Sequence, residues 1–150
     1  MTKTRLFSIG VMFFLWVPGF AGAETTGANT LLGRYWLPDH DGQFEIYQKD
    51  GRYFGRVVSY DEPEQLDENN AEPALRTRPF IGIDMFAGFR FDASDERWID
   101  GTIYDAKGGK TYDCILWFEE DKPLVLQARG YIGFSFLGRT ETFDRVAETQ

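Results

Sequence analysis

The sequence has very few of the residues that most often carry chemistry. Among 150 residues there is one cysteine, Cys114, and one histidine, His40. A single cysteine excludes an internal disulfide, and together the two residues are too few ligands for a zinc site of the usual type. None of Ser59, Ser94 and Ser135 lies in a nucleophile-elbow sequence. We therefore expect a protein that is not an enzyme, with no metal site and no cofactor.

Basic residues are also scarce. The chain has 16 Lys and Arg against 24 Asp and Glu, a net charge of −8. Without Lys3 and Arg5, which lie in the segment that we expect to be cleaved, 14 bases against 24 acids give −10. Binding to nucleic acid or to an anionic membrane surface needs a basic patch. The charge argues against both partners, although one local cationic pocket remains compatible with it.

The first 23 residues have the pattern of a signal peptide. The basic start "MTKTR" precedes an apolar run over residues 6–20 and the small residues "AGA" at 21–23. The apolar run is too short to span a bilayer comfortably, so a retained membrane anchor is the weaker alternative. We expect cleavage after Ala23, export to the periplasm of a Gram-negative bacterium, and no stable membrane span in the mature chain, residues 24–150.

The mature chain reads almost wholly as short strands joined by turns. Period-two alternation and turn residues predict strands at 33–38, 43–48, 52–60, 82–92, 97–105, 110–118, 123–131 and 138–146. The long irregular segment is 61–78. About eight consecutive strands without a helical period indicate one all-β domain, a small antiparallel up-and-down β-barrel. The whole sequence has fourteen Phe, seven Tyr and four Trp, and those in the mature chain would fill the barrel interior or surround one ligand.

Several stretches together resemble the bacterial exported family catalogued as domain of unknown function 2147. They are "LLGRYWLPDHDGQFEIYQKDGRYFGRVV" (31–58), "DENNAEPALRTRPFIG" (67–82), "GTIYDAKGGKTY" (101–112) and "RGYIGFSFLGRTETFDRV" (129–146). Many members have a cysteine pair near the second turn, and this chain has none there. The family is similar to the lipocalin-like (calycin) barrels and has no agreed activity. The resemblance implies a barrel and an exported protein, but no reaction.

The resemblance also implies a structural pair. Calycin barrels begin with a Gly-x-Trp-like step whose indole is covered by an arginine from the last strand. In this chain Gly33 and Trp36, with one extra residue between them, and Arg145 are the matching residues. A guanidinium can stack on an indole and donate hydrogen bonds to nearby carbonyls. We expect Trp36 and Arg145 to close one end of the barrel, a structural role.

Cationic and phenolic side chains gather near predicted strand ends, where they could hold the polar end of a ligand. Forked guanidinium donors and phenol hydroxyls suit a carboxylate or phosphate above an apolar cavity. The alternative, which the abundance of acids favours, is pairing with Asp67, Asp105, Asp113 and Asp144. The candidate ligand-binding residues are Arg76, Arg78, Tyr104, Lys110, Tyr112, Arg129, Tyr131 and Arg139.

Two further segments invite a functional interpretation. The acidic segment "DEPEQLDENNAE" (61–72) lacks the Asp spacing and the glycine of an EF-hand loop, so we expect a solvated loop rather than a calcium site. Because long loops of this kind are often lids, we also consider the hypothesis that segment 61–78 covers the barrel mouth. In "GYIGFSFLGR" (130–139), Phe134 and Phe136 could form an exposed rim that contacts a partner or a membrane edge. Burial in the core is the default expectation for both rings.

The sequence leaves three classes of function. The leading one is non-catalytic binding of a small, at least partly apolar or amphiphilic ligand inside the barrel. The second is an envelope interaction protein with a packed barrel that binds a protein partner. An enzyme using scattered carboxylates is the third and the weakest. The first two differ in whether the interior holds a void or is filled by side chains such as Phe89, Phe91, Leu116 and Phe118.

Overall fold

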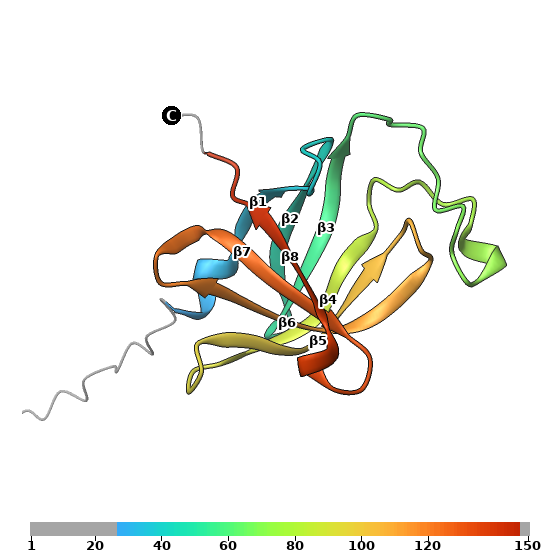
Figure 1. Cartoon of the computed structure of the whole chain (residues 1–150). Helices are drawn as coiled ribbons and strands as arrows, with labels where there is room; N and C mark the ends of the chain where they lie inside the picture. The colour runs from blue at the N-terminus through green and yellow to red at the C-terminus, as the bar shows by residue number, and fades with distance from the viewer. Residues whose placement is uncertain (1–26, 148–150) are drawn as a thin grey trace, which may run out of the picture.

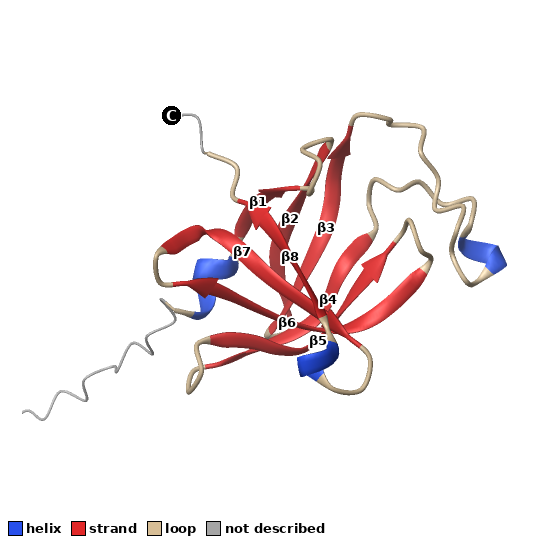
Figure 2. Ribbon diagram, viewed as in Figure 1, coloured by secondary structure: helices blue, strands red, loops and turns tan. Residues whose placement is uncertain are grey.

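The computed structural model describes residues 27–147, so the predicted signal peptide lies outside the described residues. Eight antiparallel strands form one sheet, and each pairs with its neighbours in the sequence (Figures 1 and 2). They are β1 (Gly33–Trp36), β2 (Gly42–Lys49), β3 (Arg52–Tyr60), β4 (Asp84–Asp92), β5 (Arg97–Asp105), β6 (Lys110–Glu119), β7 (Lys122–Tyr131) and β8 (Arg139–Asp144). The predicted all-β, up-and-down fold is confirmed. Between residues 27 and 147, no helix is long and apolar enough to cross a membrane.

The sheet curls into a nearly closed barrel. β1 and β8 meet through one isolated bridge between Tyr35 and Arg145, and the Val146 N–H donates to the Arg34 carbonyl at 2.9 Å. The other seven strand pairs have longer ladders. The seam therefore joins β1 only to the residues that follow β8, and within residues 27–147 β8 itself pairs only with β7.

A short helix covers one end of the barrel. The 3₁₀ helix η1 (Ala28–Leu31) buries Leu31 completely, and the Trp98 indole N–H donates to the Ala28 carbonyl at 3.2 Å. The Tyr35 hydroxyl donates to the Leu31 carbonyl at 2.8 Å. These two side-chain hydrogen bonds satisfy carbonyls of η1 and hold it against the aromatic core. We call this end the η1 end.

The opposite end, which we call the loop end, carries the β1–β2, β3–β4, β5–β6 and β7–β8 connections. The long β3–β4 segment contains the 3₁₀ helix η2 (Pro73–Leu75) and projects to the side of the barrel (Figure 1). Lys107 of the β5–β6 turn forms a salt bridge with Asp39 of the β1–β2 turn at 3.2 Å. Since β1 and β5 lie four strands apart in the sheet, this contact bridges the loop end from one turn to the other.

The barrel interior is filled with aromatic rings. Phe44 lies at its centre, with its ring centroid 5.4 Å from Tyr35, 5.2 Å from Phe86 and 5.2 Å from Phe143. All four side chains are fully buried or nearly so. Of the four residues that could fill the interior, Phe89 and Leu116 have no exposed surface, whereas Phe91 and Phe118 are only partly buried and pack against the core. The packed interior is the arrangement expected for the second function class.

The predicted inward face of β4 is wrong in its first half. Simple period-two alternation through the strand predicted at 82–92 places Met85, Ala87, Phe89 and Phe91 on one inward face, but Phe86 is the buried residue and Ala87 lies on the opposite face. The alternation changes at Gly88, whose φ is +79°. A bulge of this kind moves later side chains to the other face. The Phe89 ring then lies against Gly101 of β5, where a Cβ would be only 2.3 Å from the ring.

The β7–β8 loop contains the 3₁₀ helix η3 (Ser135–Leu137) and does not fold into the core. Phe134 and Phe136 are 65% and 74% exposed. The default expectation that these rings are buried is therefore wrong, and the exposed rim is what the structure contains. Neighbouring Ile132 and Leu137 are exposed to the same degree, so the whole loop presents an apolar surface.

Candidate functional site

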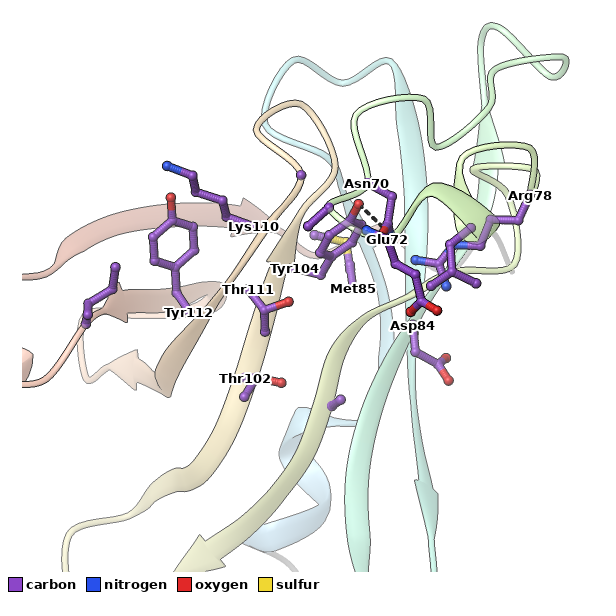
Figure 3. Close-up of a pocket in the computed structure, with 15 residues that line it drawn as sticks. Asn70, Glu72, Arg78, Asp84, Met85, Thr102, Tyr104, Lys110, Thr111 and Tyr112 are labelled. Carbon is purple, nitrogen blue, oxygen red and sulfur yellow. Dashed lines mark hydrogen bonds between the residues drawn. The ribbon is translucent and has the colours of Figure 1, made fainter.

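A depression of about 590 Å³ lies between the β3–β4 loop and the ends of β4, β5 and β6 (Figure 3). Phe86 and its partner Ile103 face the core, so the neighbouring pair Ala87 and Thr102 faces outward. The depression therefore includes the outer flank of the barrel at Ala87 and Thr102, whereas Tyr112, the partner of Ile103, lies on the face of β6 that carries Cys114. Its lining residues are Asn70, Ala71, Glu72, Leu75, Arg78, Asp84, Met85, Ala87, Thr102, Tyr104, Gly109, Lys110, Thr111, Tyr112 and Ile132.

One wall of this flank pocket is built around a buried carboxylate. Asp67 is 1% exposed and accepts hydrogen bonds from Tyr104 Oη at 2.5 Å, Asn70 Nδ2 at 2.7 Å and Arg78 Nε at 2.8 Å. Arg78 also lies over the Tyr104 ring, 5.6 Å from its centroid. Burial, and then the hydrogen bond to Asp67, raise the pKa of Tyr104, so its hydroxyl remains a donor at neutral pH. The cluster fastens the loop to β5.

A second set of contacts fixes the loop to the β5–β6 turn. Asn69 Nδ2 donates to the Lys107 carbonyl at 3.2 Å. Gly109 has a φ of +66°, and a Cβ there would lie 1.7 Å from the Asn69 carbonyl oxygen, so only glycine allows this approach. With Asp67 bound on one side and Asn69 on the other, this part of the loop forms a wall of the flank pocket, and the lid considered from the sequence stays a hypothesis.

Lys110 and Tyr112 line the other side of the flank pocket. In Figure 3 both project from β6 in the same direction, away from the cluster formed by Asn70, Tyr104 and Arg78. Within residues 27–147 neither side chain has an ion-pair or hydrogen-bond partner. The Arg78 guanidinium is occupied by Asp67, so Lys110 is the lining cation whose charge is available to a bound molecule.

Four of the eight candidate ligand-binding residues, Arg78, Tyr104, Lys110 and Tyr112, therefore line one pocket, and the other four do not. Arg76 lies behind the wall and donates to the Asn70 carbonyl at 2.8 Å. Arg129, Tyr131 and Arg139 belong to the β7–β8 corner, where Arg139 pairs with Glu141 at 2.8 Å. These three residues lie apart from the wall formed by the β3–β4 loop, because the β7–β8 connection is at a different position around the barrel.

Residues that the sequence did not single out complete the pocket. Met85, Ala87 and Leu75 supply apolar surface, and Thr102 and Thr111 supply hydroxyls. Only the bulge in β4 decides that Ala87 faces outward, and only the folding back of the loop brings Leu75 to the flank. The sequence carries no local signal for either.

The ring beneath Arg145 is Tyr35, so the expectation for Trp36 is wrong. The Arg145 guanidinium carbon lies 4.8 Å from the Tyr35 centroid, and Nη1 donates to the Leu32 carbonyl at 2.8 Å. Trp36, one residue later, points to the other face of β1 and stacks on His40 at 5.4 Å. The extra residue between Gly33 and the tryptophan reverses which ring faces inward, because strand side chains alternate.

Cys114 lies in the core on β6, 1% exposed, and burial raises the pKa of its thiol to about 12. At neutral pH the thiolate, which is the reactive species, is then on the order of a thousandfold scarcer than for a free cysteine with a pKa near 8.5. We expect the folded protein to react with iodoacetamide at least a hundredfold more slowly than the protein unfolded in urea. Equal rates of alkylation, measured by mass spectrometry, would contradict the burial.

Comparison with known proteins agrees with this architecture. Residues 33–145 match the family model described as an uncharacterized protein conserved in bacteria, DUF2147. Protein HP1028 of Helicobacter pylori, described as belonging to the lipocalin family, has a similar solved structure, with a TM-score of 0.66 and 21% sequence identity over 79% of this chain and 84% of that chain. No curated protein matches the sequence. The chain thus belongs to the DUF2147 family and has a lipocalin-like eight-stranded barrel.

Proposed function

We propose that this protein is an exported, non-catalytic binder of a small amphiphilic molecule, and that the ligand occupies the flank pocket. The observation that carries the proposal is an unpaired lysine beside a phenol at the rim of a depression whose floor is apolar. Ligand sites in proteins commonly combine apolar walls with a few polar groups that fix orientation. Export rests on the N-terminal sequence pattern, which has a basic start, an apolar run and small residues before the cut.

The charges around the pocket favour an anionic head group next to Lys110. Glu72 and Asp84 lie on the opposite side of the depression from Lys110 and Tyr112 (Figure 3). Asp84 is paired with Arg56 at 3.0 Å, so Glu72, which has no ion pair within residues 27–147, supplies the negative charge that repels an anion on that side. A carboxylate or phosphate would therefore bind between Lys110 and Tyr112, which share one face of β6, and its apolar part would extend toward Ile132.

Replacing Lys110 with glutamine is expected to weaken binding of dansyl-labelled undecanoic acid about fivefold, because an exposed ion pair contributes about 1 kcal/mol. Fluorescence titration measures the dissociation constant. Lys107→Gln is the matched control, since Lys107 is on the same hairpin, pairs with Asp39 and does not line the pocket. If both variants bind the probe as tightly as the parent protein, the assignment of Lys110 is wrong.

Native mass spectrometry identifies the natural ligand class. The protein is isolated gently from a periplasm and weighed before and after organic extraction. A reproducible extra mass that extraction removes supports the binder and reveals its ligand. A bare polypeptide mass, with no uptake from an added lipid extract, contradicts it.

The filled interior favours one second candidate, an envelope interaction protein that binds a protein partner through its outer surface. Its barrel would be a rigid support, as the packing of Phe44 and Phe86 allows. The same mass measurement separates the two candidates, because this one expects the bare mass together with a co-purifying polypeptide.

A further inference from the structure

The β7–β8 connection, residues 132–138, is an exposed apolar loop. Ile132, Phe134, Phe136 and Leu137 are 74%, 65%, 74% and 72% exposed. The two phenylalanine rings stack on each other with centroids 5.5 Å apart, and the loop contains no charged residue. Four large apolar side chains on one connection are unlike the singly scattered hydrophobic residues of an ordinary surface.

Part of the backbone of the apolar loop is hydrogen-bonded within the protein. The Ile132 carbonyl accepts from the Phe134 N–H at 3.0 Å, and the Phe134 carbonyl accepts from the Leu137 N–H at 3.1 Å. Arg129 reaches under the loop and donates to the Ser135 and Phe136 carbonyls at 2.5 and 3.0 Å. A segment that enters a lipid environment must satisfy its backbone polar groups in this way, because hydrocarbon offers no hydrogen bonds.

The size of the surface argues against a second copy of this chain as its occupant. A stable protein interface of standard size involves about 20 to 30 residues on each side. The apolar loop has only seven residues, and it projects from the end of the barrel instead of lying in a flat face (Figure 2). A projecting tip of this size is suited to insertion into a soft, deformable surface.

The charges at the base of the loop fit a phospholipid surface. Between Lys122 and Glu141 the chain contains Arg129 and Arg139 and no acid, although the whole chain carries −8. The side chain of Arg139, next to the apolar tip, is 87% exposed and also pairs with Glu141 at 2.8 Å, so a lipid phosphate would compete with that carboxylate. Cations just behind apolar and aromatic side chains match the order of a bilayer, in which phosphates lie above the acyl chains.

We propose that the apolar loop docks the protein onto a phospholipid bilayer. Ile132, Phe134, Phe136 and Leu137 insert at the boundary between head groups and acyl chains, and Arg139 lies at the level of the phosphates. This proposal does not depend on the ligand site proposed above, although the two sites share one residue. Ile132 also lines the flank pocket, so docking would place the pocket beside the membrane surface.

Vesicle flotation tests this proposal with phosphatidylcholine vesicles and with vesicles that also contain phosphatidylglycerol. The parent protein is expected to float with both, and more strongly with the anionic vesicles. The double variant Phe134→Ser with Phe136→Ser should partition into vesicles at least about tenfold less than the parent, because the loss of each ring removes a large apolar area from the inserted tip. Leu124→Ser is the matched control and should float like the parent, since Leu124 is 63% exposed but belongs to the other end of β7.

Three results would overturn the proposal. The first is a parent protein that floats with neither vesicle type, and the second is a double variant that floats as well as the parent. The third is self-association of the parent in analytical ultracentrifugation that the double variant abolishes, which would assign the loop to a second copy. The double variant should still bind dansyl-labelled undecanoic acid like the parent, because neither phenylalanine lines the flank pocket. Failure of either proposal is thus visible separately.

Discussion

Replacing Phe86 with alanine is expected to lower the free energy of unfolding by about 3 to 5 kcal/mol. The Phe86 side chain has no exposed surface, and its ring lies 5.2 Å from Phe44, 5.6 Å from Phe143 and 6.1 Å from Phe89 between centroids. Alanine would leave a cavity among rings that the strands hold in place, and neighbouring side chains could fill only part of it.

Urea denaturation followed by fluorescence measures this loss, and an unchanged dependence on urea would show that the unfolding transition is comparable. Phe134→Ala is the matched control: the same atoms are removed from a ring that is 65% exposed, and stability should change by no more than about 0.5 kcal/mol. A loss for Phe86→Ala as small as that of the control would mean that the interior is loosely packed and has room for a ligand.

Replacing Asp67 with alanine is expected to cost about 2 to 3 kcal/mol. The carboxylate is buried and accepts hydrogen bonds from Arg78, Asn70 and Tyr104, so its removal leaves three donors without their acceptor. The cost falls below that of breaking a fully buried ion pair, because the Arg78 side chain is 36% exposed and can turn toward water.

The loop should also become accessible to protease, because Asp67 joins it to β5 through Tyr104. Limited trypsin digestion measures cleavage after Arg76, which lies beside η2, and we expect it to speed up at least tenfold, in line with a local loss of about 2 kcal/mol. Glu68→Ala is the control, since Glu68 is exposed and follows Asp67 directly. Equal cleavage rates in the Asp67 variant and the control would show that other contacts hold the wall.

The packed interior changes where a ligand can be sought in this barrel. A barrel of eight strands can hold one small ligand inside, but here aromatic rings occupy its centre. The proposed site therefore lies on the flank, between the β3–β4 loop and β6. The stability of Phe86→Ala tests whether the interior is packed, and the binding of the probe by Lys110→Gln tests the site on the flank.

The sequence by itself determined the number, order and approximate limits of the strands. Alternating apolar residues mark a strand locally, and turns such as "KDG" and "AKGG" mark its ends within a few residues. The pairing of neighbouring strands follows from these short connections. The burial of Cys114 and Leu116 could be predicted for the same reason, since the alternation on β6 is uninterrupted.

Tertiary structure decided the facing of β4, the ring beneath Arg145 and the composition of the pocket. Near Gly88 the face of β4 changes, and neither the bulge nor the place of Phe89 over Gly101 follows from local spacing. Asp67 had many possible basic partners in the sequence, and only the folding back of its loop selected Arg78. These features depend on contacts between segments far apart in the chain, whereas strand patterning depends on neighbouring residues.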